Sequence, residues 1–336
     1  MRLILALVVP ITAITLTALS LAGGPEELET TYAADDCRRV EVLDPLRRPI
    51  VGVEDMAALG DGRLLLSAYD RAFRDGSVRG IYITSVERLT GEPPVQVDQL
   101  RGVATAVRAL YPHGLALDRT GRRLAFVNRP ERETAEVVWG RLDVAGFTPE
   151  GRWAEPDACR ANDLLWRGAD LLASRDRADC TASWRDLVLG SETGSIVTVG
   201  ARGARELADG LAFANGLDLD RGRIVVAETR GERLTDAASG ESVELPGGPD
   251  NLTPGPRGSL IAALHPDLFD YWLYTLGYVD RAPSRIVAVT PETERVEVLF
   301  DDPLGELFSG ASVAIWHEGA LIAGSAYAAG LLVCGS

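Results

Sequence analysis

The sequence contains no lysine, and its charge is strongly acidic. All 34 basic residues are arginine, against 49 acidic residues, so the formal net charge is −15. This balance disfavours nucleic acid and anionic membrane surfaces as partners. The exclusive use of arginine fits the codon usage of a GC-rich genome better than it fits any mechanism.

Long amphipathic helix patterns are absent as well. The chain instead has short apolar runs separated by turns rich in glycine, of which there are 35. This pattern is typical of an all-β protein. A G-x-S-x-G motif is also missing, so we expect no serine nucleophile of that type. With 336 residues, the chain can form a large core in one or two domains.

The N-terminus has the pattern of an export signal. An uncharged run from Leu3 to Ala22 follows Arg2 and ends in a small-x-small cleavage pattern. We favour a cleaved signal peptide over residues 1–22, with a retained membrane anchor as the alternative, since the run is about 20 residues long. Either form leaves the protein exported, as a periplasmic, secreted or membrane-anchored chain. Residues 23–36 are then an acidic tether, and residues 37–336 form the folded domain.

Only four cysteines are present, and in an exported chain they suggest two disulfides. Three pairings are possible. The simplest solution joins Cys159 to Cys180 locally and joins Cys37 to Cys334 at the two ends of the folded part. Four buried thiols are the alternative.

A hairpin pattern near residue 54 recurs along the chain. Residues 52–69 read GVEDMAALGDGRLLLSAY, in which two acids precede an apolar run, a glycine-rich turn and a second apolar run. The pattern returns at intervals of 36 to 61 residues. The mean of about 52 is in the range of propeller blades. The six repeats start at Glu54, His113, Asn162, Asn215, Asn251 and Ser312.

Six such repeats predict an all-β, six-bladed β-propeller. Further strand candidates between the hairpins, such as residues 80–83 and 285–289, would complete four-stranded blades. The ring closes if residues 39–43 pair with residues 330–333 in one shared blade. A bond between the first and last cysteines would lock that seam.

The six repeat starts would face one another, because the innermost strand of each propeller blade begins beside the central channel. They supply carboxylate and amide oxygens, the donors that calcium prefers, and no cysteine, which disfavours zinc. Considered without the repeat, Asn215 would be interpreted as a turn residue and His113 as a structural histidine. Their common register favours one shared ion site instead.

Six motifs in this order resemble the paraoxonase, arylesterase and lactonase propellers, within the wider gluconolactonase-like group. The resemblance extends from about Cys37 to Cys334, and it implies a six-bladed propeller with two calcium ions in its channel. It also implies a disulfide between these two cysteines, whereas Cys159 and Cys180 have no family counterpart. The motifs are VEDMA, PHGLAL, ANDLL, FANGLDL, PDNLT and ALHPD.

The resemblance further implies two sets of calcium ligands. A structural calcium would be held by Asp55, Asp163 and the backbone carbonyl of Leu115. Glu54 and Asp55 would point to different ions, because they lie on opposite sides of the strand's pleat. The catalytic calcium would be held by Glu54, Asn162, Asn215, Asp250 and Asn251.

His113 matches the family's first active-site histidine, a proposed general base. Arg129 stands where the second histidine of that proposed pair falls. An arginine cannot accept a proton, and its charge would lower the pKa of His113. Water activation would then fall to His113 alone or to Asp250. Arg129 and His265 would line the substrate pocket, and the aromatic segment 268–276 would be a lid or a surface helix between blades.

We therefore expect a calcium-dependent hydrolase of small-molecule lactones or aryl esters. Calcium would polarise the carbonyl, and His113 or Asp250 would activate water. One alternative, motivated by Arg129, is a non-catalytic binding propeller that keeps calcium for stability. A third reading is a lyase or synthase of the wider propeller group.

Overall fold

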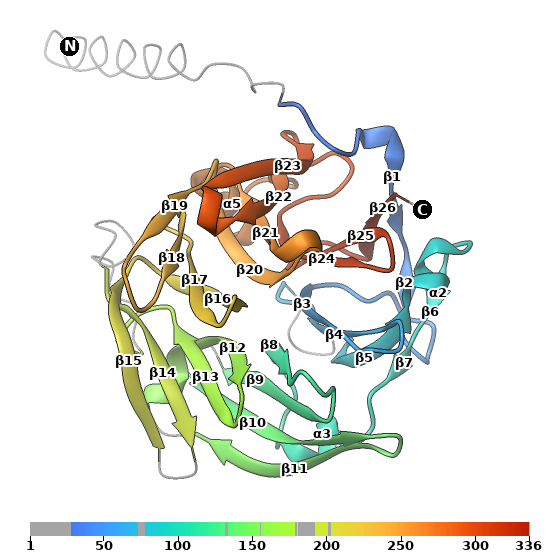
Figure 1. Ribbon diagram of the computed structural model, residues 1–336. Coiled ribbons are helices and arrows are strands. Elements are labelled where there is room, and N and C mark those ends of the chain that lie inside the picture. Colours follow the sequence, from blue (N-terminus) through green and yellow to red (C-terminus); the bar gives the residue numbers. More distant parts are fainter. Residues whose placement is uncertain are drawn as a thin grey trace, which may run out of the picture.

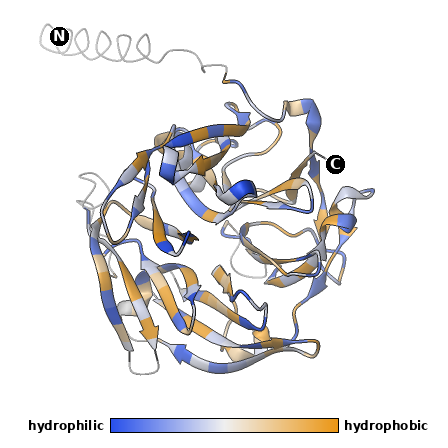
Figure 2. Cartoon of the chain, in the orientation of Figure 1, coloured by the Kyte–Doolittle hydropathy of each residue, from blue (hydrophilic) through white to orange (hydrophobic). Residues whose placement is uncertain are grey.

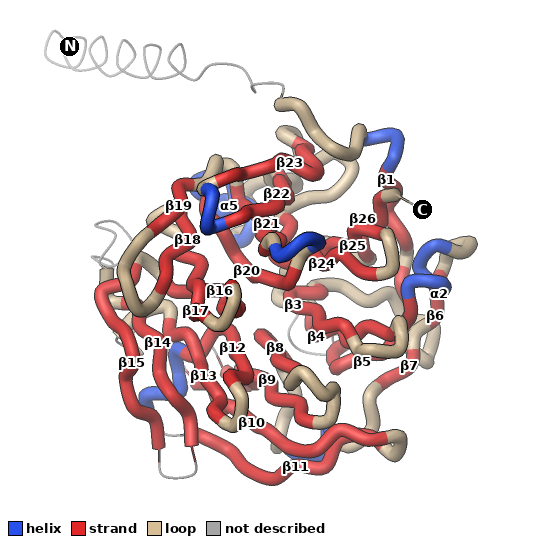
Figure 3. The backbone as a smooth tube through the Cα atoms, in the orientation of Figure 1, coloured by secondary structure: helices blue, strands red, loops and turns tan. Residues whose placement is uncertain are grey.

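Short apolar runs with alternating inward and outward side chains pair into six four-stranded antiparallel sheets around a central axis (Figure 1). The computed structural model describes residues 28–72, 78–131, 134–154, 156–178, 180, 192–200 and 203–335. The prediction of a six-bladed all-β propeller is confirmed. The tube view shows how small the helical share of the described chain is (Figure 3).

The first two strands of each blade are the hairpins that the repeat predicted. The innermost strands touch one another in ring order and so line the axis. They are β3 (Val53–Ala58), β8 (Pro112–Leu117), β12 (Ala161–Arg167), β16 (Ala214–Asp220), β20 (Gly248–Pro254) and β24 (Ala311–His317). The second strands are β4 (Arg63–Tyr69), β9 (Arg123–Glu131), β13 (Asp170–Arg175), β17 (Arg223–Glu228), β21 (Leu260–His265) and β25 (Ala320–Ser325).

Two further strands complete each blade toward the outside. The third strands are β5 (Arg79–Ser85), β10 (Thr134–Asp143), β14 (Gly194–Gly200), β18 (Arg233–Asp236), β22 (Ser284–Thr290) and β26 (Leu331–Cys334). The outermost strands are β7 (Asp98–Gln99), β11 (Gly146–Trp153), β15 (Gly203–Leu211), β19 (Ser242–Glu244), β23 (Arg295–Asp302) and β1 (Cys37–Val40). Hydrophobic and hydrophilic residues form alternating bands along these strands (Figure 2).

The last blade is shared between the two ends of the chain, as predicted. Strand β1 pairs with β26 in a register that places Cys37 opposite Cys334, and the two cysteines form a disulfide. The predicted single strand over residues 39–43 is wrong in one respect. The chain leaves the closing blade at Glu41, and β2 (Val42–Leu43) pairs instead with β6 (Val95–Gln96) beside the first blade.

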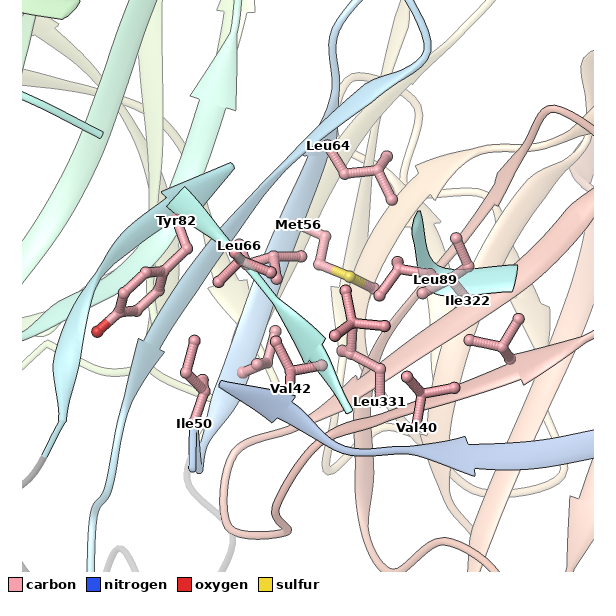
Figure 4. Close-up of a cluster of buried hydrophobic side chains, with 14 of the residues drawn as sticks. Val40, Val42, Ile50, Met56, Leu64, Leu66, Tyr82, Leu89, Ile322 and Leu331 are labelled. Atoms are coloured by element: carbon pink, nitrogen blue, oxygen red, sulfur yellow. The ribbon is translucent and has the colours of Figure 1, made fainter. Parts of the chain in front are cut away.

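Buried apolar side chains fill the spaces between neighbouring blades. At the seam of the ring, Val40 and Leu331 of the closing blade pack in one cluster with Met56 and Leu66 of the first blade (Figure 4). Burial of each such side chain contributes about 1.5–3 kcal/mol. The apolar seam and the disulfide therefore hold the same junction.

The helices of the described residues are short and lie outside the sheets. The α-helices among them are α2 (Val86–Thr90), α3 (Val103–Ala106) and α5 (Leu268–Thr275). The 3-10 turns are η1 (Ala34–Asp36), η2 (Pro156–Arg160), η3 (Pro256–Gly258) and η4 (Pro291–Thr293). Among the described residues, no helix is long and apolar enough to cross a membrane.

The predicted signal segment, residues 1–22, lies outside the described residues. The described part of the predicted tether lies against the propeller, since Thr31 and Tyr32 donate backbone hydrogen bonds to β23. The second disulfide joins Cys159 to Cys180, so both predicted pairings are confirmed. Two disulfides fit an oxidising, exported environment.

Candidate functional site

Each innermost strand is irregular at its start, at the residues that the repeat singled out. The pairing with the second strand shifts between Val53 and Asp55 in the first blade, and the same shift occurs near the start of the first strand in all five other blades. A β-bulge leaves residues outside the ladder and re-aims their side chains. The sequence therefore places polar residues where the backbone turns them toward the channel.

Glu54, His113 and Asn162 form a connected group at one end of the channel. Arg71 Nη2 lies 2.5 Å from Glu54 Oε2 and 2.8 Å from His113 Nδ1. The Glu54 carboxylate also contacts His113 Nδ1, and His113 Nε2 lies 2.7 Å from Asn162 Oδ1. Asn162 Oδ1 only accepts, so His113 Nε2 donates its hydrogen to it, while Nδ1 lies between the donor Arg71 and the acceptor Glu54.

Asp250 is the centre of a second group at the same end. Its Oδ1 accepts a hydrogen bond of 2.6 Å from Asn215 Nδ2, and its Oδ2 lies 3.0 Å from His265 Nε2. His265 is only 1% exposed and stacks on Tyr271, with ring centroids 3.5 Å apart. Asn251 Nδ2 donates to the backbone carbonyl of Glu54 at 2.9 Å, which links the two groups.

A cavity of about 690 Å³ opens onto both groups. Helix α5 forms part of its wall through Tyr271 and Trp272, while Phe269 and Trp272 remain 62% and 43% exposed. The aromatic segment therefore forms one wall of this cavity and is partly exposed on its other side. Arg129, Asn162 and His265 also line this cavity.

Two buried amide oxygens indicate what the cluster can hold. Asn215 Oδ1 and Asn251 Oδ1 have no hydrogen-bond partner within the described parts of the chain. Buried acceptors without donors are costly, and a cation would satisfy them. With the carboxylates of Glu54 and Asp250 they form a hard oxygen set that fits calcium. No three His, Cys, Asp or Glu side chains group as a metal site among the described residues, so the amides are essential to the set.

Electrostatics at this end favour an ionised Glu54 and lower the pKa of His113. Burial raises the pKa of Glu54, but the neighbouring His113 and Arg71 outweigh this effect and lower the pKa to about 2. Burial and the charge of Arg129 lower the pKa of His113. The predicted effect of Arg129 on His113 is therefore confirmed.

Asp55 and Asp163 lie at the other end of the channel, beside a cavity of about 590 Å³. Asp55 Oδ2 accepts from the backbone N–H of Leu115 at 2.6 Å, and Asp163 Oδ2 accepts from that of Leu217 at 2.7 Å. Burial raises the pKa of Asp55 well above its usual range, and burial together with the charge of Asp55 does the same for Asp163. Two buried acids with neutral donors suit a bound cation.

Glycine follows the repeat start in two blades because neighbouring inner strands approach closely there. A Cβ atom on Gly114 would lie 2.3 Å from the carbonyl oxygen of Asn162. One on Gly216 would lie 2.6 Å from the carbonyl oxygen of Asp250. The Asn215-Gly216 pair is therefore part of the strand β16, and it is not a plain turn.

Several residues of the cavity wall were missed at the sequence level, namely Arg71, Arg177, Arg230 and Tyr327. Arg129 and His265, which were predicted to line the substrate pocket, line the same cavity. All six lie near the ends of the second strands, and four of them are arginines, a signal visible in the sequence once strand ends are aligned.

No protein-family model and no curated protein match the chain. Solved propeller structures match nearly all of it at low identity. A proposed gluconolactonase is 14% identical with a TM-score of 0.50, over 91% of this chain and 94% of that chain. The catalytically inactive virginiamycin B lyase from Staphylococcus aureus with quinupristin is 10% identical with a TM-score of 0.50, over 89% and 99%.

The WD40 repeats of RRP9 are 11% identical, with a TM-score of 0.52 over 92% of this chain and 99% of that chain. The similar structures thus include gluconolactonase-like propellers together with propellers of other kinds. At these identities the likeness shows the fold alone: a six-bladed β-propeller.

Proposed function

We propose that the protein is a calcium-dependent hydrolase of lactones or aryl esters. One observation carries the proposal. Two buried amide oxygens without donors, on Asn215 and Asn251, lie in one cluster with the carboxylates of Glu54 and Asp250, below a cavity with aromatic walls. When bound, calcium supplies a Lewis acid that polarises an ester or lactone carbonyl.

The chain's own groups would position the substrate and move the proton. Asn162, Asn215, Asn251, Glu54 and Asp250 would hold the ion; amides make up three of these five ligands, which limits the negative charge around it. The aromatic rings of Tyr271 and Trp272 would contact the aryl or acyl part and exclude water from it.

Asp250 is the stronger candidate for the general base. Both ring nitrogens of His113 are engaged by protein groups within 2.8 Å, namely Arg71 and Asn162. Asp250 lies within hydrogen-bond distance of Asn215 and His265, and no arginine is among its hydrogen-bond partners in the described part of the chain. Asp250 would take the proton of the attacking water, and His265 would hold the carboxylate in place.

The test is a panel of aryl esters and lactones, assayed with calcium and after removal of calcium by a chelator. We expect turnover only with calcium. Asp250→Asn should lower kcat by about 10²–10⁴-fold, whereas His113→Gln should change it by less than about 10-fold. Calorimetric titration of calcium into each variant shows whether the substitution has weakened calcium binding. A variant that binds calcium normally but is inactive has lost the general base. Activity that survives chelation excludes the mechanism.

A non-catalytic binding propeller is the second candidate, and Arg71 favours it. Its guanidinium lies 2.5 Å from Glu54 and partly neutralises a proposed calcium ligand. This reading predicts calcium-dependent melting without turnover of any ester or lactone in the panel. A lyase would instead convert substrates to products other than those of hydrolysis.

A further inference from the structure

The cavity is rich in arginine although the chain as a whole is acidic. The net charge is −15, yet four guanidinium groups and three carboxylates line this one cavity. The arginines come from similar places in four blades, because each lies within two residues of the end of a second strand, namely β4, β9, β13 or β17. They are Arg71, Arg129, Arg177 and Arg230.

Arg177 has a buried donor that its neighbours do not use. Its Nε lies 3.3 Å from Asp176 Oδ1, whereas its Nη1 is buried and has no hydrogen-bond partner among the residues that the structure describes. Asp176 is also shared, since Arg129 and Arg160 each approach it to 3.9 Å. An unused guanidinium N–H beside a cavity is a ready donor for an anion.

Phe213 holds Arg177 and Arg230 at one wall of the cavity. Both guanidinium groups lie over its ring, at 5.6 Å and 5.3 Å from the centroid. The backbone of Phe213 has a φ of 66°, in the left-handed region that a bulky side chain rarely adopts. Such strain tends to persist where a functional arrangement requires it. The guanidinium groups of Arg177 and Arg230 therefore lie at one wall of the cavity, which Thr229 and Asn215 also line.

We propose that this wall binds an anionic group of the substrate, with a carboxylate as its simplest form. This inference rests on the proposed function and names its substrate class. The scissile carbonyl would lie at the Glu54–Asp250 cluster while Arg177 and Arg230 hold the remote carboxylate, because guanidinium forks match carboxylate geometry. The apolar chain between the two would contact Tyr271 and Trp272 of α5.

The test compares two matched esters, the 4-nitrophenyl monoester of glutaric acid and its methyl ester. We expect kcat/KM for the free acid to be at least about 10-fold higher. Arg177→Gln and Arg230→Gln should each remove about 10-fold or more from the acid and leave the methyl ester within about 3-fold. Arg177→Lys, which keeps the charge, should retain part of the preference if folding is intact.

Arg122→Gln is the matched control, because Arg122 is exposed and lies away from this cavity. It should leave both substrates unchanged. Equal kcat/KM for the two wild-type substrates, or equal losses for both in Arg177→Gln, would overturn the inference while leaving hydrolysis in place.

Binding without turnover is measured separately, by calorimetry with glutarate and with inorganic phosphate. Glutarate binding that Arg177→Gln weakens about 10-fold or more supports the anion site even if no ester is hydrolysed, in which case only the proposed function fails. Binding of phosphate alone would overturn the choice of carboxylate. If neither anion binds, the inference is wrong.

Discussion

Glu54 and Asp55 are neighbours in the chain, yet they belong to opposite ends of the channel. Glu54 lies beside Arg71 and His113 and has a pKa lowered to about 2. Among the residues that the structure describes, Asp55 accepts only from the backbone N–H groups of Met56 and Leu115, and burial raises its pKa well above the usual range. One strand thus presents an ion-paired acid to one cavity and, at the other end of the channel, an acid that faces only backbone donors to a second cavity.

The difference between these two acids shows that negative charge is compensated differently at the two ends of the channel. The arginines near the second-strand ends reach the cavity beside Glu54, whereas the end of the channel beside Asp55 has carboxylates facing backbone donors. A cation at the Asp55 end would supply the missing compensation and add stability. At the Glu54 end, the compensation already present leaves the groups available for a substrate.

The strongest test exchanges the two acids for amides, one at a time. Glu54→Gln should lower kcat/KM by more than about 100-fold, because it removes a proposed calcium ligand. It should also cost about 3–5 kcal/mol, since Arg71 is left buried without its carboxylate. Ester hydrolysis and chemical unfolding measure the two effects.

Asp55→Asn is the counterpart and should act on stability instead. Without calcium its melting temperature should rise, because a costly buried carboxylate is gone. The increase in melting temperature that calcium causes in the wild type should be absent from Asp55→Asn. If Asp55→Asn abolishes activity at saturating calcium while Glu54→Gln leaves it intact, the assignment of the two channel ends is reversed.

Removal of the disulfides should have the next largest effect on stability. One disulfide closes the whole ring, whereas the other is a local bond near the cavity. Loss of Cys37–Cys334, which closes a loop of 297 residues, should cost up to about 5 kcal/mol. Loss of Cys159–Cys180, with a separation of 21 residues, should cost about 3 kcal/mol. Paired Cys→Ser variants and denaturant unfolding measure both. Calcium-dependent melting should weaken only in the first variant.

Gly216→Ala tests the close approach of strands between the two channel ends. The added Cβ would lie 2.6 Å from both Asp250 O and Leu252 N, so we expect a loss of about 1–3 kcal/mol and lower activity. Gly60→Ala is the control, since no atom lies within 4 Å of its added Cβ. Equal stability of the two variants would contradict the close approach of Gly216 to the backbone of Asp250 and Leu252.

Substitution of Asp218, which lines the cavity beside Asp55, should give the smallest effect, a change in how stability depends on pH. Burial raises its pKa to about 7, so the stability linked to its neutral form is full below pH about 4 and is lost as the pH rises through about 7. Asp218→Asn should therefore gain about 1–2 kcal/mol at pH 8 and little at pH 4, with its partial exposure limiting the gain.

Asp170→Asn, at an exposed position, serves as the control for Asp218→Asn. Unfolding in urea at several pH values measures the difference between the two variants. A gain that does not vary with pH would rule out Asp218 as its source.

The repeat made much of the fold predictable. Hairpins such as residues 54–66 and 250–263 contain strong local turn signals, so the six blades and the ring closure followed from register alone. The break at Glu41 was not predictable, because the switch from β1 to β2 depends on pairing with β6, which lies far away in sequence. No local pattern distinguishes one long strand from two short ones there.

Part of the candidate site was also visible in the sequence. The polar repeat starts, from Glu54 to Ser312, stood out as unusual before apolar strands. Arg177 and Arg230 did not stand out, because an arginine after a strand is ordinarily a solvated turn residue. Only the arrangement of the blades shows that these strand ends meet at one cavity.

By itself, then, the sequence determined the number of blades, the closing pairs and the identity of the polar residues at the channel. The tertiary structure decided how charge is distributed between the channel ends. The bulges turn adjacent residues such as Glu54 and Asp55 to opposite ends, and ring closure brings arginines from four blades to one of those ends. Long-range packing sets the pKa of a buried acid, because desolvation and neighbouring charges depend on distance in space rather than on position in the chain.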